Sequence, residues 1–173
     1  PFMDPFLNQF ESLPIHNRRL GILPGSRIPE VGDNLCLILR VVEYIGANVP
    51  VYEGCSLPLS ATLTPGRKPN IPSIEPNKIH GAYLDLPEAK TSKENINAVE
   101  YLIHSFLESE GDVSLVPVGP LTNVAVAIRQ APEILDKIPE IVIMGGGHHV
   151  NNVTSSAEFN IWVDPEAARI VMN

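Results

Sequence analysis

The chain has 173 residues, 44% hydrophobic and 18% charged, which is typical of a soluble globular protein with one sizeable core, so we expect a single domain over residues 1–173. Twelve basic and twenty acidic residues give a net charge of −8, which disfavours nucleic acid and anionic membranes and permits a neutral ligand or a cation. No segment approaches the roughly 18 consecutive apolar residues of a membrane span. Cys36 and Cys55 lack the spacing of zinc or redox motifs and fit a reduced, cytoplasmic setting.

The first half of the chain is rich in proline, which predicts long connections between its elements. Residues 1–32 show no sustained periodicity and are assigned no element. Apolar residues then recur at helical spacing from Asp33 until Gly46, which predicts a helix, and the β-branched run at 49–52 predicts a short strand. Residues 58–90 form a long connection, and a loop of that length in a compact domain is more often functional or mobile than idle.

Helices and strands alternate in the second half. Thr91 and Glu94 have the spacing of a capping box, which predicts a helix that begins there and ends near Gly111. The apolar run at 113–118 predicts a buried strand, and apolar residues at helical spacing predict a helix over 121–135.

A further strand is predicted at 141–144, and Asp164-Pro165 has the pattern of an N-cap followed by the first residue of a last helix. Because the strands are continuous apolar runs that alternate with helices, we expect an α/β domain with an open, largely parallel central sheet that is buried on both faces. Ligands of such sheets bind at the carboxyl ends of the strands, which here precede "GPLTN" and "GGGHHVNN".

The segment that follows the 141–144 strand is dense in neutral hydrogen-bonding groups and contains one carboxylate, Glu158. Amides and a carboxylate suit a polyhydroxylated ligand such as a sugar. Glu158 and Asn160 are two residues apart, so in an extended segment they would project to the same face. A polar surface loop whose asparagines cap turns is an equally open alternative.

Glycines 145–147 would let the backbone approach a ligand closely, but they lack the spacing of a phosphate-binding loop, and a tight turn is the more frequent reason for such a run. His148 and His149 are adjacent, so an extended loop would point them apart, and no partners stand at zinc spacing. Each is more often an exposed loop histidine than a ligand, as is His80 in the long connection.

Five stretches, in this order, resemble the nucleoside hydrolases, the inosine-uridine-type nucleoside N-ribohydrolases: "NVPVYEGCSLPL", "IHG", "VPVGPLTNVAVAIRQAPEIL", "IVIMGGGHH" and "AEFNIWVDPEAARIV". The resemblance covers roughly residues 34–173. It implies hydrolysis of a ribonucleoside to ribose and free base, in which a calcium ion holds a water and the ribose hydroxyls and an aspartate deprotonates the water. It also implies a homodimer or a homotetramer.

The family's functional residues carry over to six positions of this sequence. The resemblance implies that the backbone carbonyl of Val118 is a calcium ligand, that Met144 packs near the sugar, and that His80 lies in a loop near the base. It assigns ribose binding to Asn152, Glu158 and Asn160.

This sequence departs from the family's pattern at the metal site. It lacks the aspartate-rich DxDxxxDD motif, for which a lone Asp4 is no substitute, and Ser26 stands about where the family has an asparagine. The family's later histidine–aspartate pair would lie beyond Asn173. We therefore expect the central portion of a longer hydrolase, without a general base of its own. The alternatives are a nucleoside- or ribose-binding homologue without the metal, and a structural remnant that binds no nucleoside.

Overall fold

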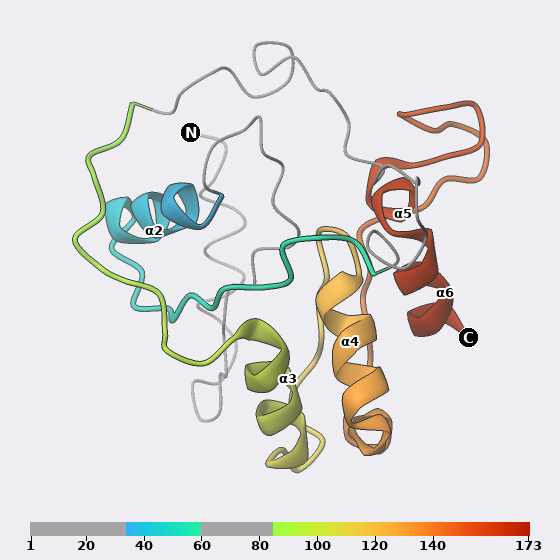
Figure 1. Cartoon of the computed structure of the whole chain (residues 1–173), viewed down its shortest axis with the longest axis horizontal. Coiled ribbons are helices and arrows are strands. Elements are labelled where there is room, and N and C mark those ends of the chain that lie inside the picture. Colours follow the sequence, from blue (N-terminus) through green and yellow to red (C-terminus); the bar gives the residue numbers. More distant parts are fainter. Residues whose placement is uncertain (1–33, 60–84) are drawn as a thin grey trace.

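A computed structural model describes residues 34–59 and 85–173 of the chain (Figure 1). The expectations for residues 1–32, and those for Asp4, Ser26 and His80, lie outside the described residues. The described elements, in chain order, are α2 (Asn34–Tyr44), α3 (Ala98–Leu107), α4 (Thr122–Gln130), the 3-10 helix η3 (Pro132–Lys137), α5 (Phe159–Val163) and α6 (Pro165–Met172).

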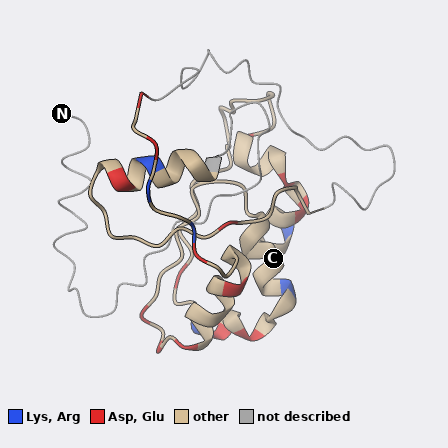
Figure 2. Ribbon diagram, turned by 60° about the vertical axis from the view of Figure 1, so that its left-hand side comes forward, with Lys and Arg blue, Asp and Glu red and all other residues tan. Residues whose placement is uncertain are grey.

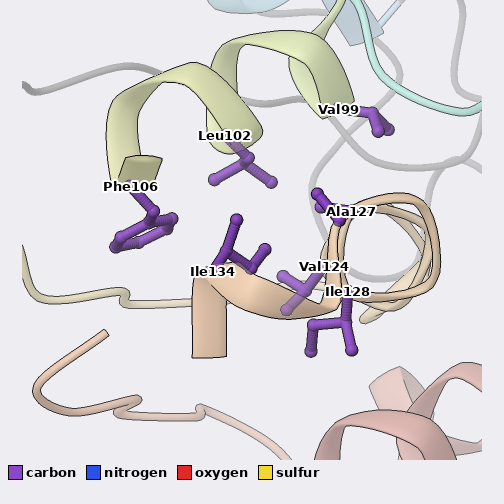
Figure 3. Close-up of a cluster of buried hydrophobic side chains, with 8 residues drawn as sticks. Val99, Leu102, Phe106, Val124, Ala127, Ile128 and Ile134 are labelled. Atoms are coloured by element: carbon purple, nitrogen blue, oxygen red, sulfur yellow. The ribbon is translucent and has the colours of Figure 1, made fainter. Parts of the chain in front are cut away.

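The main hydrophobic core lies between α3, α4 and η3 (Figure 3). Leu102 and Phe106 from α3 face Val124 and Ile128 from α4, and Ile134 of η3 closes the cluster with 1% of its surface exposed. Burial of an apolar side chain of this size contributes about 1.5–3 kcal/mol, so this cluster holds the three elements together.

The α3 helix begins six residues later than its capping-box pattern predicted, and that prediction is wrong. Its N-cap is Asn97, whose side chain accepts a hydrogen bond from the backbone N–H of Glu100 at 2.9 Å. Thr91 instead donates from its backbone N–H at 3.0 Å and from its hydroxyl at 3.2 Å to the carboxylate of Glu43 on α2. A tertiary contact therefore replaces the local cap, and the irregular connection over residues 85–97 contacts α2 through Pro87, Lys90 and Thr91.

The helix predicted over 121–135 is divided into α4 and η3. Proline has no N–H to continue the α-helical ladder, and Pro132 stands where α4 has just ended at Gln130. Ala131 between them has φ −139° and ψ 76°, which is outside the helical region. The change of direction at Ala131 points the Ile134 side chain into the hydrophobic core.

The segments predicted as strands at 113–118 and 141–144 do run parallel, as expected. Leu115 and Ile141 form a parallel β-bridge, and Met144 donates its backbone N–H to the carbonyl of Pro117 at 2.9 Å. The expectation that both faces are buried is wrong for the described residues. Side chains alternate along both segments, so one face packs toward the helices and the other exposes Val116 (58%), Val118 (64%), Val142 (52%) and Met144 (53%).

The last helix forms as predicted: Asp164 caps α6 by accepting from the backbone N–H of Ala167 at 3.0 Å, and Pro165 is its first residue. Both cysteines are free, with Cys36 exposed and Cys55 partly buried. Acidic residues outnumber basic ones along the described chain (Figure 2). Within residues 34–59 and 85–173, no helix is long and apolar enough to span a membrane.

Candidate functional site

The carboxyl ends of the two parallel segments are joined by the side chain of Asn160. Its amide nitrogen donates to the carbonyl oxygen of Met144 at 2.9 Å and to that of Val118 at 3.3 Å. Asn160 lies in the first turn of α5 and is 6% exposed. The structure therefore brings together three of the residues singled out from the sequence, and it uses the Asn160 amide to fix the ends of both segments.

Glu158 is held rigidly at the start of α5. It is the N-cap of this helix, and its Oε2 accepts from the backbone N–H groups of Gly146 at 2.9 Å, Asn160 at 3.0 Å and Ile161 at 3.4 Å. The expectation that Glu158 and Asn160 share one face of an extended segment is wrong. Only Glu158 is extended, because its carboxylate caps a helix that already contains Asn160.

The environment of Glu158 favours its ionised form. Burial by itself raises the pKa of the carboxyl, but the backbone hydrogen bonds from Gly146, Asn160 and Ile161 and a hydrogen bond from the Asn152 side chain together outweigh burial and hold the pKa below its ordinary value of 4.5. At neutral pH the site therefore contains a fixed negative charge with acceptor capacity only.

Asn152 lies on the exposed loop before α5, and the structure places it beside Glu158. Its Oδ1 accepts the backbone N–H of Phe159 at 2.8 Å, which leaves the side-chain amide group as a donor. Asn152 and Glu158 thus both satisfy free N–H groups in the first turn of α5. Both side chains are therefore tied to the first turn of this short helix.

The glycine run is needed where the loop crosses the site. A Cβ on Gly145 would lie 3.3 Å from Glu158 Oε2 and 3.6 Å from Asn160 Cβ. Gly146 has φ +75°, a left-handed conformation that favours glycine, and its backbone N–H donates to the Glu158 carboxylate. The run is therefore more than a tight turn. Three consecutive glycines are visible in the sequence, but their contact with Glu158 is not.

Other predicted residues are arranged differently. The His148 and His149 rings contact each other edge to face with centroids 4.1 Å apart, so the expectation that they point apart is wrong; both are exposed. Asn151 donates to the carbonyl of Ser155 at 3.1 Å, while its buried Oδ1 has no hydrogen-bond partner in the described structure. Sequence reasoning gave Asn151 no role separate from its neighbours.

The region around the Val118 carbonyl contains oxygen atoms, which are the ligands that a hard cation such as calcium prefers, but too few of them for a complete calcium site. Among the described residues, no group of three or more His, Cys, Asp or Glu side chains is placed to hold a metal ion. Calcium takes 6–8 oxygen ligands, of which this region offers backbone carbonyls, amides and one carboxylate. The described residues can thus contribute ligands without completing a calcium site.

A family model described as "Inosine-uridine preferring nucleoside hydrolase" matches residues 30–173. The chain belongs to this nucleoside hydrolase family. It is 47% identical over 137 residues to the pyrimidine-specific ribonucleoside hydrolase RihB of Escherichia coli O1:K1, an overlap of 77% of this chain and 41% of that protein. The putative RihB of Shigella dysenteriae serotype 1 is 45% identical over 150 residues, which cover 84% of this chain and 49% of the relative.

Solved structures agree with this family assignment. The purine-preferring ribonucleoside hydrolase from Gardnerella vaginalis superposes with a TM-score of 0.72 at 32% identity, covering 87% of this chain and 47% of that one. A plant nucleoside hydrolase superposes with a TM-score of 0.68 at 31% identity. The chain therefore shares the nucleoside hydrolase fold, and it spans less than half the length of these relatives.

Proposed function

We propose that this chain carries the ribose-binding part of a ribonucleoside hydrolase, which cleaves the N-glycosidic bond to give ribose and free base. The observation that supports the proposal most is the carboxylate of Glu158, fixed by three backbone N–H groups beside Asn152 and the glycine run. The relatives are named as pyrimidine-specific in the case of RihB and purine-preferring in the case of the Gardnerella enzyme, which makes ribose the shared part of their ligands.

A preorganised carboxylate suits the two neighbouring hydroxyls of a ribose. An ionised carboxyl accepts hydrogen bonds and donates none, whereas each sugar hydroxyl supplies a donor, and the amide of Asn152 can donate to a hydroxyl oxygen. Because folding has already ordered Glu158, binding does not have to order it again. Its lowered pKa keeps the acceptor charged at neutral pH.

In the proposed reaction the oxygen of water forms a bond to the anomeric carbon as the bond from that carbon to the base nitrogen breaks. The water gives up one proton and the departing base takes one up, so that the products are ribose and the free base. Glu158 and Asn152 orient the sugar, the side chain of Met144 packs near it, and Asn160 keeps the carbonyls of Val118 and Met144 in place. His80, outside the described residues, would lie near the base.

The metal proposed for this site is calcium, for which the Val118 carbonyl would supply one ligand and residues beyond those described the carboxylates. When bound, such an ion supplies an activated water and holds sugar hydroxyls. We further propose a homodimer or a homotetramer in a reduced, cytoplasmic setting, consistent with the free cysteines Cys36 and Cys55.

Release of reducing sugar from uridine, cytidine, inosine and adenosine, with calcium added or chelated, tests the activity. In the full-length enzyme to which this portion is proposed to belong, we expect calcium-dependent release that Glu158→Ala abolishes. Glu140→Gln is the matched control. Glu140 directly precedes the 141–144 segment, at the end away from the candidate site, and its carboxylate accepts a hydrogen bond from the Ser114 hydroxyl. Absence of release from all four nucleosides would refute the hydrolase proposal and leave ribose binding to be measured alone.

A further inference from the structure

Asp164 is the most deeply buried charged residue of the described chain, at 0% exposure, and its two carboxylate oxygens have different partners. Oδ1 accepts the backbone N–H of Ala167 at 3.0 Å and so caps α6. Oδ2 accepts the hydroxyl of Thr122 at 2.6 Å and the backbone N–H of Leu59 at 2.8 Å. A helix cap needs only Oδ1, so the contacts of Oδ2 with Thr122 and Leu59 are not part of the α6 cap.

The contact between Asp164 and Thr122 forms one of two links between the same pair of segments. Thr122 lies four residues after Val118, and Asp164 lies four residues after Asn160. The Asn160 amide joins Val118 at one end, and Asp164 joins Thr122 at the other. The two hydrogen bonds therefore close a ring that fixes segment 118–122 against segment 160–164.

A third segment is attached to the same ring. Cys55 donates its backbone N–H to Oδ1 of Asn123 at 2.8 Å, and Leu59 donates to Asp164, so residues 55–59 are held at both ends. In Figure 1 this segment crosses the start of α4 and reaches the junction of α5 and α6. Asn123 and Thr122 are 5% and 1% exposed, so water does not compete for these hydrogen bonds.

We propose that Asp164 is a positioning residue for the ribose site: through Oδ2 it sets the place of α5, and with it Glu158 and Asn160, relative to the Val118 carbonyl. Its link to ligand binding rests on the proposed function, whereas its effect on Asn160 does not. A shift of α5 would move the Glu158 carboxylate away from the strand ends without removing any ligand-contacting group. Binding groups require placement to within about 0.5 Å. Between segments 118–122 and 160–164 the hydrogen bond from Asn160 to Val118 is long, at 3.3 Å, so the second link through Asp164 adds to the precision of placement.

Thr122→Val removes one of the two hydrogen bonds to Oδ2 and leaves the α6 cap intact, while Thr122→Ser keeps the hydroxyl and serves as the rescue. Ile134→Val, in the core between α3 and α4, is the control for general loss of packing. The side-chain amide protons of Asn160 are followed by NMR, together with the dissociation constant of uridine. Asp164→Asn is a second test, because its Oδ1 still caps α6 but its new amide cannot accept from Thr122 and Leu59.

In Thr122→Val and Asp164→Asn we expect the Asn160 amide protons to shift toward the values of a free amide and to exchange faster, and uridine affinity to fall at least about threefold. Thr122→Ser should restore both, and Ile134→Val should change neither. Unchanged Asn160 signals in both linking variants would overturn the proposal. If the signals respond as expected but the unaltered protein binds no uridine, the proposed function fails and the positioning role stands.

Discussion

Replacement of Asn160 by alanine tests whether this side chain joins the two strand ends. The change removes two hydrogen bonds, to Met144 O at 2.9 Å and to Val118 O at 3.3 Å, each with a net contribution of about 0.5–1.5 kcal/mol. Alanine is the better helix former by about 0.5 kcal/mol, which offsets part of the loss. Val118 and Met144 are more than half exposed, so water can reach the strand ends. We therefore expect a loss of about 1–2 kcal/mol in the free energy of unfolding.

Urea denaturation followed by tryptophan fluorescence measures this loss. Trp162, the single tryptophan of the chain, lies on α5 two residues after Asn160 and reports on the affected helix. Asn173→Ala, at the exposed end of α6, is the control and should change stability by less than about 0.5 kcal/mol. Equal urea midpoints for the two variants, with equal slopes, would refute the role assigned to Asn160.

Three further predictions concern neighbouring features. Because folding lowers the pKa of Glu158, the ionised carboxylate stabilises the fold at pH values above its ordinary pKa of 4.5, and this stabilisation is lost as the pH falls through the folded pKa. The urea midpoint of Glu158→Gln should not show this loss on acidification. A pH profile identical to that of the unaltered protein would contradict the prediction. Gly147→Ala should destabilise by about 1–3 kcal/mol in thermal melts, since its Cβ would lie 2.6 Å from a backbone oxygen, whereas Gly119→Ala, which meets open space, should not. Asn97→Ala should lose about 1 kcal/mol of stability and Thr91→Ala less, and the reverse order would restore the capping-box prediction.

The elements that could be predicted from the sequence are those whose signals are local. The apolar spacing of α2 ended correctly at Gly46, which has φ +68°, and Asp164-Pro165 marked the start of α6. The start of α3 was missed because Thr91 contacts Glu43, a residue distant in sequence. Propensity and capping patterns are overridden where such tertiary contacts compete.

The residues of the candidate site were found by resemblance, and their grouping near the strand ends was predictable from the α/β pattern. Their ribose-binding role stays a prediction. The conformation of residues 158–160 could not be predicted from the spacing of apolar residues, because a five-residue helix is too short to show a helical period. Nothing in the sequence alone separates the two oxygens of Asp164, since one caps its own helix while the other contacts Thr122 and Leu59 from distant segments.

We have proposed that this chain recognises the ribose of a ribonucleoside through Glu158 and Asn152. Calorimetric titration with uridine and with 2′-deoxyuridine, in calcium and again in chelator, measures whether the 2′-hydroxyl contributes to binding. We expect uridine to bind at least about tenfold more tightly than the deoxy compound, and Glu158→Ala to remove the difference, because a lost hydrogen bond to a charged group weakens binding by about 1.5–3 kcal/mol. Equal affinity for the two nucleosides, or a preference that survives in Glu158→Ala, would contradict the proposal.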